Sequence, residues 1–380
     1  MNAKIILYLA LIVTAFVSSG CTTVSGIVGL NQKCIVIVKR GQIRSSNAIV
    51  ALDLLEVKRG DSLEVLGSDL IEGEKWFNVR ASDEDNTEGW IEGRNIITQD
   101  ILEKSRQIAE EDKNVPSQSA GQLLNPSNIR WSPDRTNDNN IMFKLDKNAI
   151  FDIVGWKLVP RNDNDDTKDD KTKNVPNTNS AQANNRSAKP VKDQNAPMQM
   201  DDKYDVWYKV RLQPLDSPAP AGWIYGKQVE LAVPSDIIFY RTGREFVAWS
   251  RLDGDVQTNV VTFSRGKDAA KDDKPGSWVV LERSNTLQEN NGEQPDFDRI
   301  LILGYDKFNQ DHYKVYRSGN VKGYLPLIVT GSGESRAFSV RMKGEDGEAR
   351  EIQFGTYKDK SGHLKVNVPT DIPKDDKREN

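Results

Sequence analysis

The sequence predicts an all-β protein with two small barrels related by an internal repeat, followed by a third domain that is a β-sandwich or another barrel. Short runs rich in Val, Ile and aromatic residues alternate with polar turns along most of the chain, which is typical of strands. One set of landmarks occurs twice in the same order, which indicates a repeated unit. Only residues 99–113 combine strong helix formers over enough length to predict a helix.

The first twenty residues predict export. Lys4 precedes thirteen uncharged residues, Ile5 to Val17, a run too short to span a bilayer but typical of the apolar core of a secretory signal. The run ends in Ser18-Ser19-Gly20-Cys21. Small residues directly before a cysteine resemble the lipobox of bacterial lipoproteins, although Ser18 stands where that family prefers Leu.

This resemblance implies removal of residues 1–20 and lipidation of Cys21, which leaves residues 21–31 as a lipidated tether on a membrane. Two or more acyl chains, palmitate among them, anchor a protein stably. In a Gram-negative cell, Thr22 favours the outer membrane, because Asp at this position is the family's signal for inner-membrane retention. A plain cleavable signal without lipid is the alternative.

Composition limits the partners and the redox chemistry. The formal net charge of −4 becomes −5 when Lys4 leaves with the signal, and this acidic balance argues against nucleic acid or anionic lipid as the main partner. The chain has two cysteines, so lipidation of Cys21 leaves Cys34 without a disulfide partner. Cys34 lies in an apolar run, which predicts a buried and inert thiol.

Residues 32–98 form the first predicted barrel domain, with turn signals such as Lys-Arg-Gly-Asp at 58–61 between apolar runs. Residues 99–121 follow as a linker, which opens with the predicted helix and ends in a stretch containing Pro, Ser and Gln. The predicted strands are Cys34–Val38, Ile49–Val57, Ser62–Leu66, Trp76–Val79 and Gly89–Ile91.

Residues 122–233 form the second predicted barrel domain, with a disordered insert at 161–203. Residues 161–200 contain no aromatic residue, no Leu and no Ile. The insert carries eight basic and eight acidic residues, so it is neutral and very polar. It cannot bury enough apolar surface to offset its chain entropy. A domain tolerates such an insert because the entropy of loop closure rises slowly with length.

The repeat rests on four landmarks. In the first copy they are Gln42-Ile43-Arg44-Ser45, Leu63-Glu64-Val65-Leu66-Gly67, Trp76-Phe77-Asn78-Val79-Arg80 and Gly89-Trp90-Ile91. In the second copy the corresponding segments, in the same order, are Asn128-Ile129-Arg130-Trp131-Ser132-Pro133, Phe151-Asp152-Ile153-Val154-Gly155, Trp207-Tyr208-Lys209-Val210-Arg211 and Gly222-Trp223-Ile224. They resemble the bacterial SH3 domain, whose pattern is an Arg-Ser-Gly-Pro-like turn, a strand ending in Gly, Trp-Tyr-x-Val and Gly-Trp-Val. The resemblance implies a small, partly open barrel of about five to seven short strands.

The landmarks also supply the candidate core and binding residues. Trp76, Trp90, Trp207 and Trp223 are predicted to be core residues, and Gly before Trp predicts a close approach of neighbouring strands. Aromatic side chains near exposed turns offer flat contact area at low entropic cost. The candidate binding residues are therefore Arg44, Phe77, Arg130, Trp131, Tyr208 and Tyr225, with both arginines expected to be exposed.

Residues 236–369 predict the third β domain, because short apolar runs alternate with polar, Gly-rich turns and no helix pattern intervenes. Residues 298–329 faintly echo the repeat, which leaves a third, degenerate SH3-like copy open. The tail at 370–380 is predicted to be disordered. The predicted strands are Glu245–Leu252, Val260–Ser264, Ser277–Arg283, Arg299–Gly304, Tyr313–Tyr316, Gly323–Val329, Arg336–Met342, Ala349–Phe354 and Leu364–Val368.

No residue set predicts catalysis or metal binding. Envelope enzymes that carry bacterial SH3 domains often add a Cys/His peptidase domain, but Cys34 lies far in sequence from His312 and His363. Two histidines without a local partner pattern predict no zinc site. The acidic run at 163–170 lacks the Gly and closing Glu of a calcium loop. The sequence therefore predicts a non-enzymatic protein without cofactor or metal.

Three functions remain in order of preference. The first is a membrane-anchored envelope lipoprotein whose SH3-like modules bind peptidoglycan or an envelope protein. The second is a structural lipoprotein that helps to assemble a multiprotein envelope complex. The third is a hydrolase in 236–369 that uses carboxylates, which requires a cleft where two acidic side chains face each other.

Overall fold

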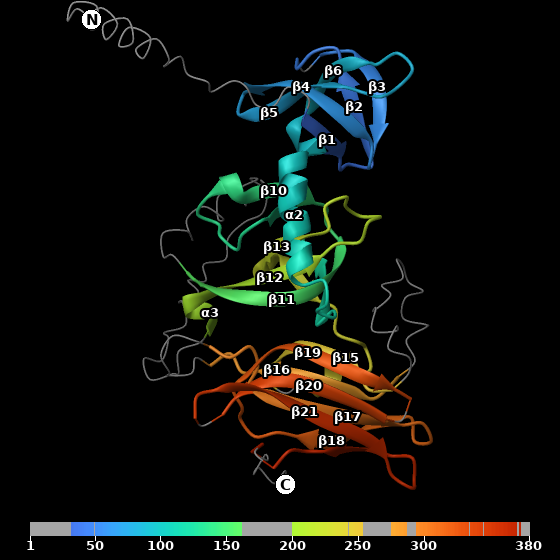
Figure 1. Ribbon diagram of the computed structural model, residues 1–380, viewed down its shortest axis with the longest axis vertical. Coiled ribbons are helices and arrows are strands. Elements are labelled where there is room, and N and C mark those ends of the chain that lie inside the picture. Colours follow the sequence, from blue (N-terminus) through green and yellow to red (C-terminus); the bar gives the residue numbers. More distant parts are fainter. Residues whose placement is uncertain are drawn as a thin grey trace, which may run out of the picture. The chain divides into compact units, whose positions relative to one another are not determined.

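The computed structural model describes residues 32–48, 50–161, 200–241, 243–253, 275–286, 294–333, 335–344, 346–370 and 372–373. Over this part of the chain the protein is all-β with one helix of more than a single turn, as predicted (Figure 1). Residues 1–102 and 103–380 form two compact units. The predicted signal and tether and nearly all of the predicted insert lie outside the described residues.

The first repeat, residues 32–98, is one antiparallel sheet in the order β3-β2-β6-β5-β4-β1-β7. Alternate residues of its strands point into one core, where Ile43, Val79 and Ile91 are completely buried. The strands are β1 (Gln32–Val36), β2 (Arg40–Arg44), β3 (Asp53–Lys58), β4 (Ser62–Ile71), β5 (Glu74–Arg80), β6 (Glu88–Glu92) and β7 (Ile96–Thr98). The strand β2 is one that the sequence pattern did not predict.

The second repeat, residues 119–231, has the strand order β10-β9-β13-β12-β11-β8-β14, which is the order of the first repeat with each number raised by seven. The registers agree as well: Arg44 pairs with Trp90 and Arg130 pairs with Trp223. The strand order is therefore repeated, as the landmarks predict. The strands are β8 (Ser119–Leu123), β9 (Ser127–Arg130), β10 (Ile141–Leu145), β11 (Ile150–Pro160), β12 (Tyr204–Arg211), β13 (Ala221–Tyr225) and β14 (Val229–Leu231).

The helix α2 (Gln99–Glu111) joins the two repeats, and its C-terminal part packs on the second. The buried Ser105 hydroxyl donates to the carbonyl of Ala221 at 2.6 Å and accepts from the N–H of the same residue. Lys209 lies 2.6 Å from Glu111, and Arg211 donates to the carbonyl of Asp112. These cations stabilise the C-terminal end of the helix, where unpaired carbonyls carry partial negative charge.

The third domain is a sandwich of two four-stranded antiparallel sheets, which decides between the two predicted architectures (Figure 1). Residues of both sheets share one core, in which the rings of Phe338 and Phe354 stack at 4.6 Å. The first sheet contains β15 (Glu245–Arg251), β16 (Trp278–Arg283), β17 (Arg299–Asp306) and β18 (Asp311–Arg317). The second contains β19 (Gly323–Ser332), β20 (Ser335–Lys343), β21 (Ala349–Lys358) and β22 (Leu364–Asn367).

The outer face of the first sheet of the sandwich is also covered. Phe246, Trp249 and Trp278 point away from the shared core and pack beneath residues 231–240, which include the short helix η5 (Ile238–Tyr240). The backbone of Trp249 also donates to the carbonyl of Gln118 in the second repeat. Second repeat and sandwich are therefore continuous within one compact unit.

The structure corrects two predicted boundaries and decides one alternative that the sequence left open. Residues 298–329 are not a third copy, because β17 and β18 belong to one sheet and β19 to the other. The disordered insert does not reach 203, because Met200–Lys203 form the helix α3 and Met200 is buried. The disordered tail does not begin at 370, because Ile372 is buried in the sandwich core. The predicted strand Val260–Ser264 lies outside the described residues.

Candidate functional site

The four tryptophans of the repeats divide into two pairs. Trp207 is 1% exposed and Trp76 is 9% exposed, as expected of core residues. Trp90 and Trp223 are only half-buried, so their assignment to the core is wrong. The reason is strand alternation: Ile91 and Ile224 take the inward positions in β6 and β13, and each preceding Trp therefore faces outward.

Two aromatic residues predicted for a binding groove are buried instead. Phe77 is 7% exposed and belongs to the core of the first repeat, so it cannot present its ring to a ligand. Tyr225 is 8% exposed, and its ring lies 5.6 Å from the ring of Trp207. Both predictions are wrong because burial here depends on contacts across strands rather than on the local turn.

The two predicted arginines differ. Arg44 is half-buried and lies 3.3 Å from Asp53. Arg130 is 8% exposed, so its predicted exposure is wrong. Its guanidinium donates to the side chain of Asn140 at 2.5 Å and to the carbonyl of Asn137 at 3.1 Å. It thus holds the loop after β9 in place and is a structural residue, because a buried charge must be paired.

Trp131 is half-buried at the start of that loop. The ammonium group of Lys104, on α2, lies 3.8 Å from the centre of its ring. This cation–π contact covers one face of the indole and fastens the loop to the helix. Of the six candidate binding residues, Tyr208 lines a groove.

The repeat groove, as we name it, is lined on the side of the second repeat by β12, β14 and the short helix η4 (Gly226–Gln228), and it has a volume of about 580 Å³. Its other wall is formed by η5 and by the start of the sandwich. Phe239, which follows the lining residue Ile238, is 86% exposed. Both charge signs line it. The lining includes Arg161, Asp205, Tyr208, Lys227, Arg241 and Glu245.

The carboxylate of Asp205, in the groove wall, contacts three polar side chains. The guanidinium of Arg161 donates to it at 3.3 Å, and Arg135 lies 3.9 Å away. The hydroxyl of Tyr225 also donates to it at 3.0 Å. Burial and the Asp205 carboxylate raise the pKa of Tyr225 to about 12, so this phenol stays a hydrogen-bond donor at neutral pH.

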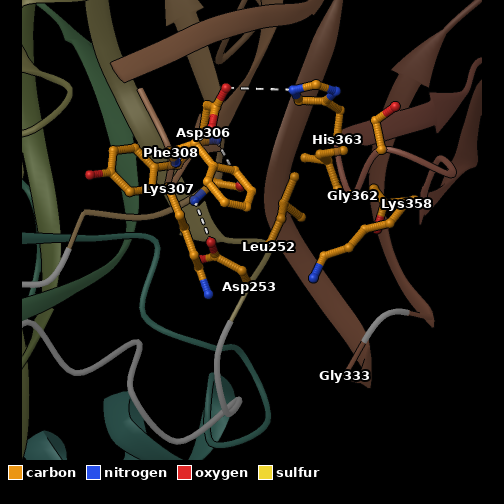
Figure 2. Close-up of a pocket in the computed structure, with 14 residues that line it drawn as sticks. Leu252, Asp253, Asp306, Lys307, Phe308, Gly333, Lys358, Gly362 and His363 are labelled. Carbon is orange, nitrogen blue, oxygen red and sulfur yellow. Dashed lines mark hydrogen bonds and ion pairs between the residues drawn. The ribbon is translucent and has the colours of Figure 1, made fainter. Parts of the chain in front are cut away.

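A second concave site, the sandwich-end cavity, lies between the two sheets at one end of the sandwich and has a volume of about 310 Å³ (Figure 2). Asp253 follows β15, and Lys307 and Phe308 lie in the turn between β17 and β18. The second sheet contributes Lys358 at the end of β21 and the turn that carries His363. The sequence did not predict this site, because its residues come from separate loops.

Histidine and carboxylates meet at the rim of this cavity. One ring nitrogen of His363 lies 3.6 Å from Asp306 (Figure 2). The other lies 3.9 Å from Asp359. Hydrogen bonds from the backbone N–H groups of Phe308 and Asn309 lower the pKa of Asp306. The edge of the Tyr313 ring meets the His363 ring at 5.3 Å, which fixes the imidazole from a third side.

The catalytic chemistry of these residues is limited. A general acid in a glycosidase-like pair needs a raised pKa, whereas the pKa of Asp306 is lowered. Burial raises the pKa of the Cys34 thiol to about 12, so it carries almost no thiolate at neutral pH. Within the described ranges, no group of three or more His, Cys, Asp or Glu side chains is arranged to hold a metal ion.

Comparisons with known proteins identify no family. No family model matches the chain, and no curated protein matches it. Among solved structures, NlpC2 from Trichomonas vaginalis is similar at 9% identity and a TM-score of 0.16, over 91% of this chain and 97% of its own. NlpC1 from the same organism is similar at 12% identity and a TM-score of 0.15, over 93% and 98%. At these values neither similarity defines a shared fold or a shared activity.

The described residues contain no helix long and apolar enough to cross a membrane.

Proposed function

We propose that this chain is an exported, lipid-anchored envelope protein without catalytic activity, and that its second repeat binds the peptide part of peptidoglycan. The signal-like first twenty residues and the cysteine at 21 support export and anchoring. The repeated landmarks support the relation to bacterial SH3 domains. The single observation that carries the ligand is the repeat groove, a concave surface lined by β12, η4 and β14.

The groove has the chemistry of a peptide site. Lys227 and Arg241 supply cations for carboxylate groups, and Glu230 supplies an anion for an amine. Cell-wall stem peptides are short and carry both kinds of group, so their charges complement those of the groove. Tyr208 adds a flat surface with a polar tip in the same wall. A short peptide that lies in the groove would meet these groups.

Anchoring and binding support each other in this proposal. A protein held at a membrane by lipid on Cys21 samples a small volume near the wall, so even weak binding at the groove becomes effective. A weak site is expected here, because the lining is polar and each charged side chain loses hydration when the peptide binds.

Co-sedimentation of the full chain, purified in detergent, with peptidoglycan sacculi tests this function. Lys227→Glu and Arg241→Glu reverse two exposed charges of the groove, and each should lower the bound fraction several-fold. Lys147→Glu is the matched control, because this exposed lysine lies in the turn between β10 and β11 and does not line the groove. Wild-type protein that stays in the supernatant, or groove variants that sediment like wild type, would each contradict the proposal.

A second candidate function is the assembly of an envelope complex, and one observation favours it. Four apolar side chains of the first repeat are exposed: Val50 by 92%, Leu52 by 74%, Leu54 by 46% and Leu70 by 68%. Asn47 donates to Asp69 at 3.3 Å, which fastens the loop of the first two to the end of β4. A group of exposed apolar residues is typical of protein interfaces.

Cross-linking in intact cells separates the two functions. Leu52→Glu should remove cross-linked partners of this chain while sedimentation with sacculi stays unchanged, if the first repeat docks onto a protein. Unchanged cross-linked species in this variant would exclude the apolar group as the docking surface. Lys58→Glu, an exposed substitution at the end of β3, is the control for charge alone.

A further inference from the structure

Three largely exposed apolar side chains lie at one end of the first repeat. Val50 and Leu52 belong to the loop between β2 and β3, and Leu70 lies near the end of β4. The side chain of Asn47 donates to that of Asp69 at 3.3 Å, which holds this loop beside the end of β4. We name Val50, Leu52 and Leu70 the apolar apex. Peptide binding by the repeat groove does not account for it, because that groove belongs to the second repeat and the sandwich.

The loop of the apolar apex is ordered by its own hydrogen bonds. The backbone N–H of Ser45 donates to the carbonyl of Leu52 at 2.9 Å, and the hydroxyl oxygen of Ser45 accepts from the N–H of Leu52 at 3.1 Å. The N–H of Ala51 donates to the carbonyl of Ala48 at 3.1 Å. Residues 45–52 also include no charged side chain. A loop of this kind can enter an apolar medium at low cost, since these backbone groups already have partners.

The chain enters the first repeat at the same end. Gln32, the first described residue, pairs with Val65 in β4, and β1 is antiparallel to β4. The start of β1 therefore points toward the end of β4 that carries Leu70. With lipid on Cys21, residues 22–31 span at most about 35 Å, which is close to the diameter of a small domain. Anchoring thus keeps the apolar apex within reach of the bilayer.

The charges near the apolar apex determine the kind of lipid that it fits. The first repeat, residues 32–98, carries nine basic and twelve acidic residues. Asp69 and Glu72 lie next to Leu70 in the sequence, and both are exposed. Carboxylates are negative at neutral pH, so they repel anionic head groups but complement the ammonium groups of zwitterionic ones. These neighbours fit a shallow position, with the carboxylates at head-group level and the apolar tips below them.

We propose that the apolar apex inserts into the surface of the membrane that holds the lipid anchor, among zwitterionic lipids. The inference rests on the anchoring part of the proposed function and is independent of peptide binding. Exposed apolar groups mark membrane sites as well as protein interfaces. The membrane is favoured here because the anchor brings lipid to this end of the repeat. Three side chains alone bind a bilayer weakly, but the anchor raises their effective concentration there.

Fluorescence of a label at the apolar apex tests the inference. The lipidated full chain with Leu52→Cys is labelled with an NBD group and reconstituted into phosphatidylcholine vesicles. Labelling is selective because Cys21 is acylated and Cys34 is buried, which raises the pKa of its thiol to about 12. The NBD emission should lie at shorter wavelength and be several-fold stronger than that of Lys58→Cys in the same vesicles, and spin-labelled lipids should quench it. Lys58 is the matched control, because it is exposed at the opposite end of β3.

A second label and vesicle flotation separate the outcomes. A label at Leu70→Cys should also be quenched, and adding Leu52→Glu should reduce that quenching several-fold, since both residues belong to one inserting group. Phosphatidylglycerol in the vesicles should weaken the quenching, and stronger quenching would overturn the match to zwitterionic lipid. A chain that does not float with the vesicles would contradict the anchoring and, with it, this inference. A chain that floats while the label at 52 is as exposed to water as that at 58 would overturn the inference alone and favour a protein partner for these residues.

Discussion

The glycine before each outward-facing tryptophan lies where two strands of the repeat approach each other closely. A Cβ added at Gly222 would lie 2.3 Å from Cγ2 of Ile129 and 2.6 Å from Cε of Met142. A Cβ at Gly89 would lie 2.4 Å from the carbonyl oxygen of Arg44. All three contacts are far inside van der Waals distance, so each glycine allows β13 or β6 to cross the neighbouring strand closely.

Gly222→Ala should therefore destabilise the second repeat by about 1–3 kcal/mol, the usual cost of overpacking a core. Thermal unfolding followed by circular dichroism measures the effect as a lowered melting temperature. Gly155→Ala is the matched control, because this glycine in β11 has no other atom within 4 Å of the added Cβ. A melting temperature for Gly222→Ala equal to that of the control would show that the crossing is looser than the structure has it.

At the scale of elements, Asp236 adds polar contacts to the apolar packing of residues 231–240 over the outer face of the first sandwich sheet. Asp236 accepts from the indole N–H of Trp278 at 2.9 Å and from the N–H of Gly276 at 3.2 Å. Nε2 of His312, on β18, lies 3.5 Å from Asp236 and 2.8 Å from the carbonyl of Gly276. Tyr240 packs against the same imidazole. The contact between residues 231–240 and the sheet therefore includes a histidine whose charge depends on pH.

The stability of this unit should depend on pH through His312. Burial lowers the pKa of His312, but the hydrogen bonds to Asp236 and to the carbonyl of Gly276 raise it by more, so the net shift is upward. A raised pKa in the folded state means that the protonated imidazole stabilises the fold below the unfolded pKa of about 6.5. This stabilisation is lost as pH rises through the higher folded pKa.

Denaturant unfolding at several pH values, followed by tryptophan fluorescence, should show stability falling from pH 6 to pH 8. Asp236→Asn should flatten this dependence while it keeps an acceptor for Trp278. Since the chain has two histidines, His363→Gln is the control and should leave the slope in place. A slope that survives in Asp236→Asn but disappears in His363→Gln would assign the dependence to the other histidine.

For the whole molecule, the repeated architecture was the most predictable feature and the sites were the least. Landmarks such as Gly222-Trp223 serve contacts between one strand and the strand beside it. Their order in the sequence therefore predicts the order of the strands. The burial of Arg130 depends on Asn140, and that of Tyr225 on partners such as Asp205 and Trp207, which the local pattern does not reveal.

The sandwich-end cavity shows the same limit more sharply. Lys307 and Lys358 lie about fifty residues apart in the sequence, Lys307 in the turn between β17 and β18 and Lys358 at the end of β21, next to the turn that leads to β22. Each turn alone has the composition of an ordinary solvent-exposed hairpin. Only the packing of the two sheets brings them to one cavity, so the topology had to be known before the site could be recognised.

The junction of the second repeat and the sandwich determines whether they unfold together. The side chain of Gln118 is buried and makes two hydrogen bonds with the backbone of Leu327 in β19: its amide donates to the carbonyl at 3.1 Å, and its oxygen accepts from the N–H at 2.6 Å. Gln118 thereby satisfies the backbone N–H and carbonyl groups of Leu327 in the sandwich, as a neighbouring strand would. The junction predicts one cooperative transition for residues 103–380.

Gln118→Ala should break that cooperativity. It leaves the N–H and carbonyl of Leu327 without their partner in a buried place, which costs about 1–3 kcal/mol for each unsatisfied group. Differential scanning calorimetry should then resolve the repeat and the sandwich as separate transitions, both at lower temperature than the joint transition of the wild type. Gln213→Ala, in an exposed turn of the same unit, should leave the trace unchanged. If Gln118→Ala lowers the melting temperature but keeps a single transition, the remaining contacts at the junction, such as Trp249 with the backbone of Gln118, are sufficient to couple the two domains.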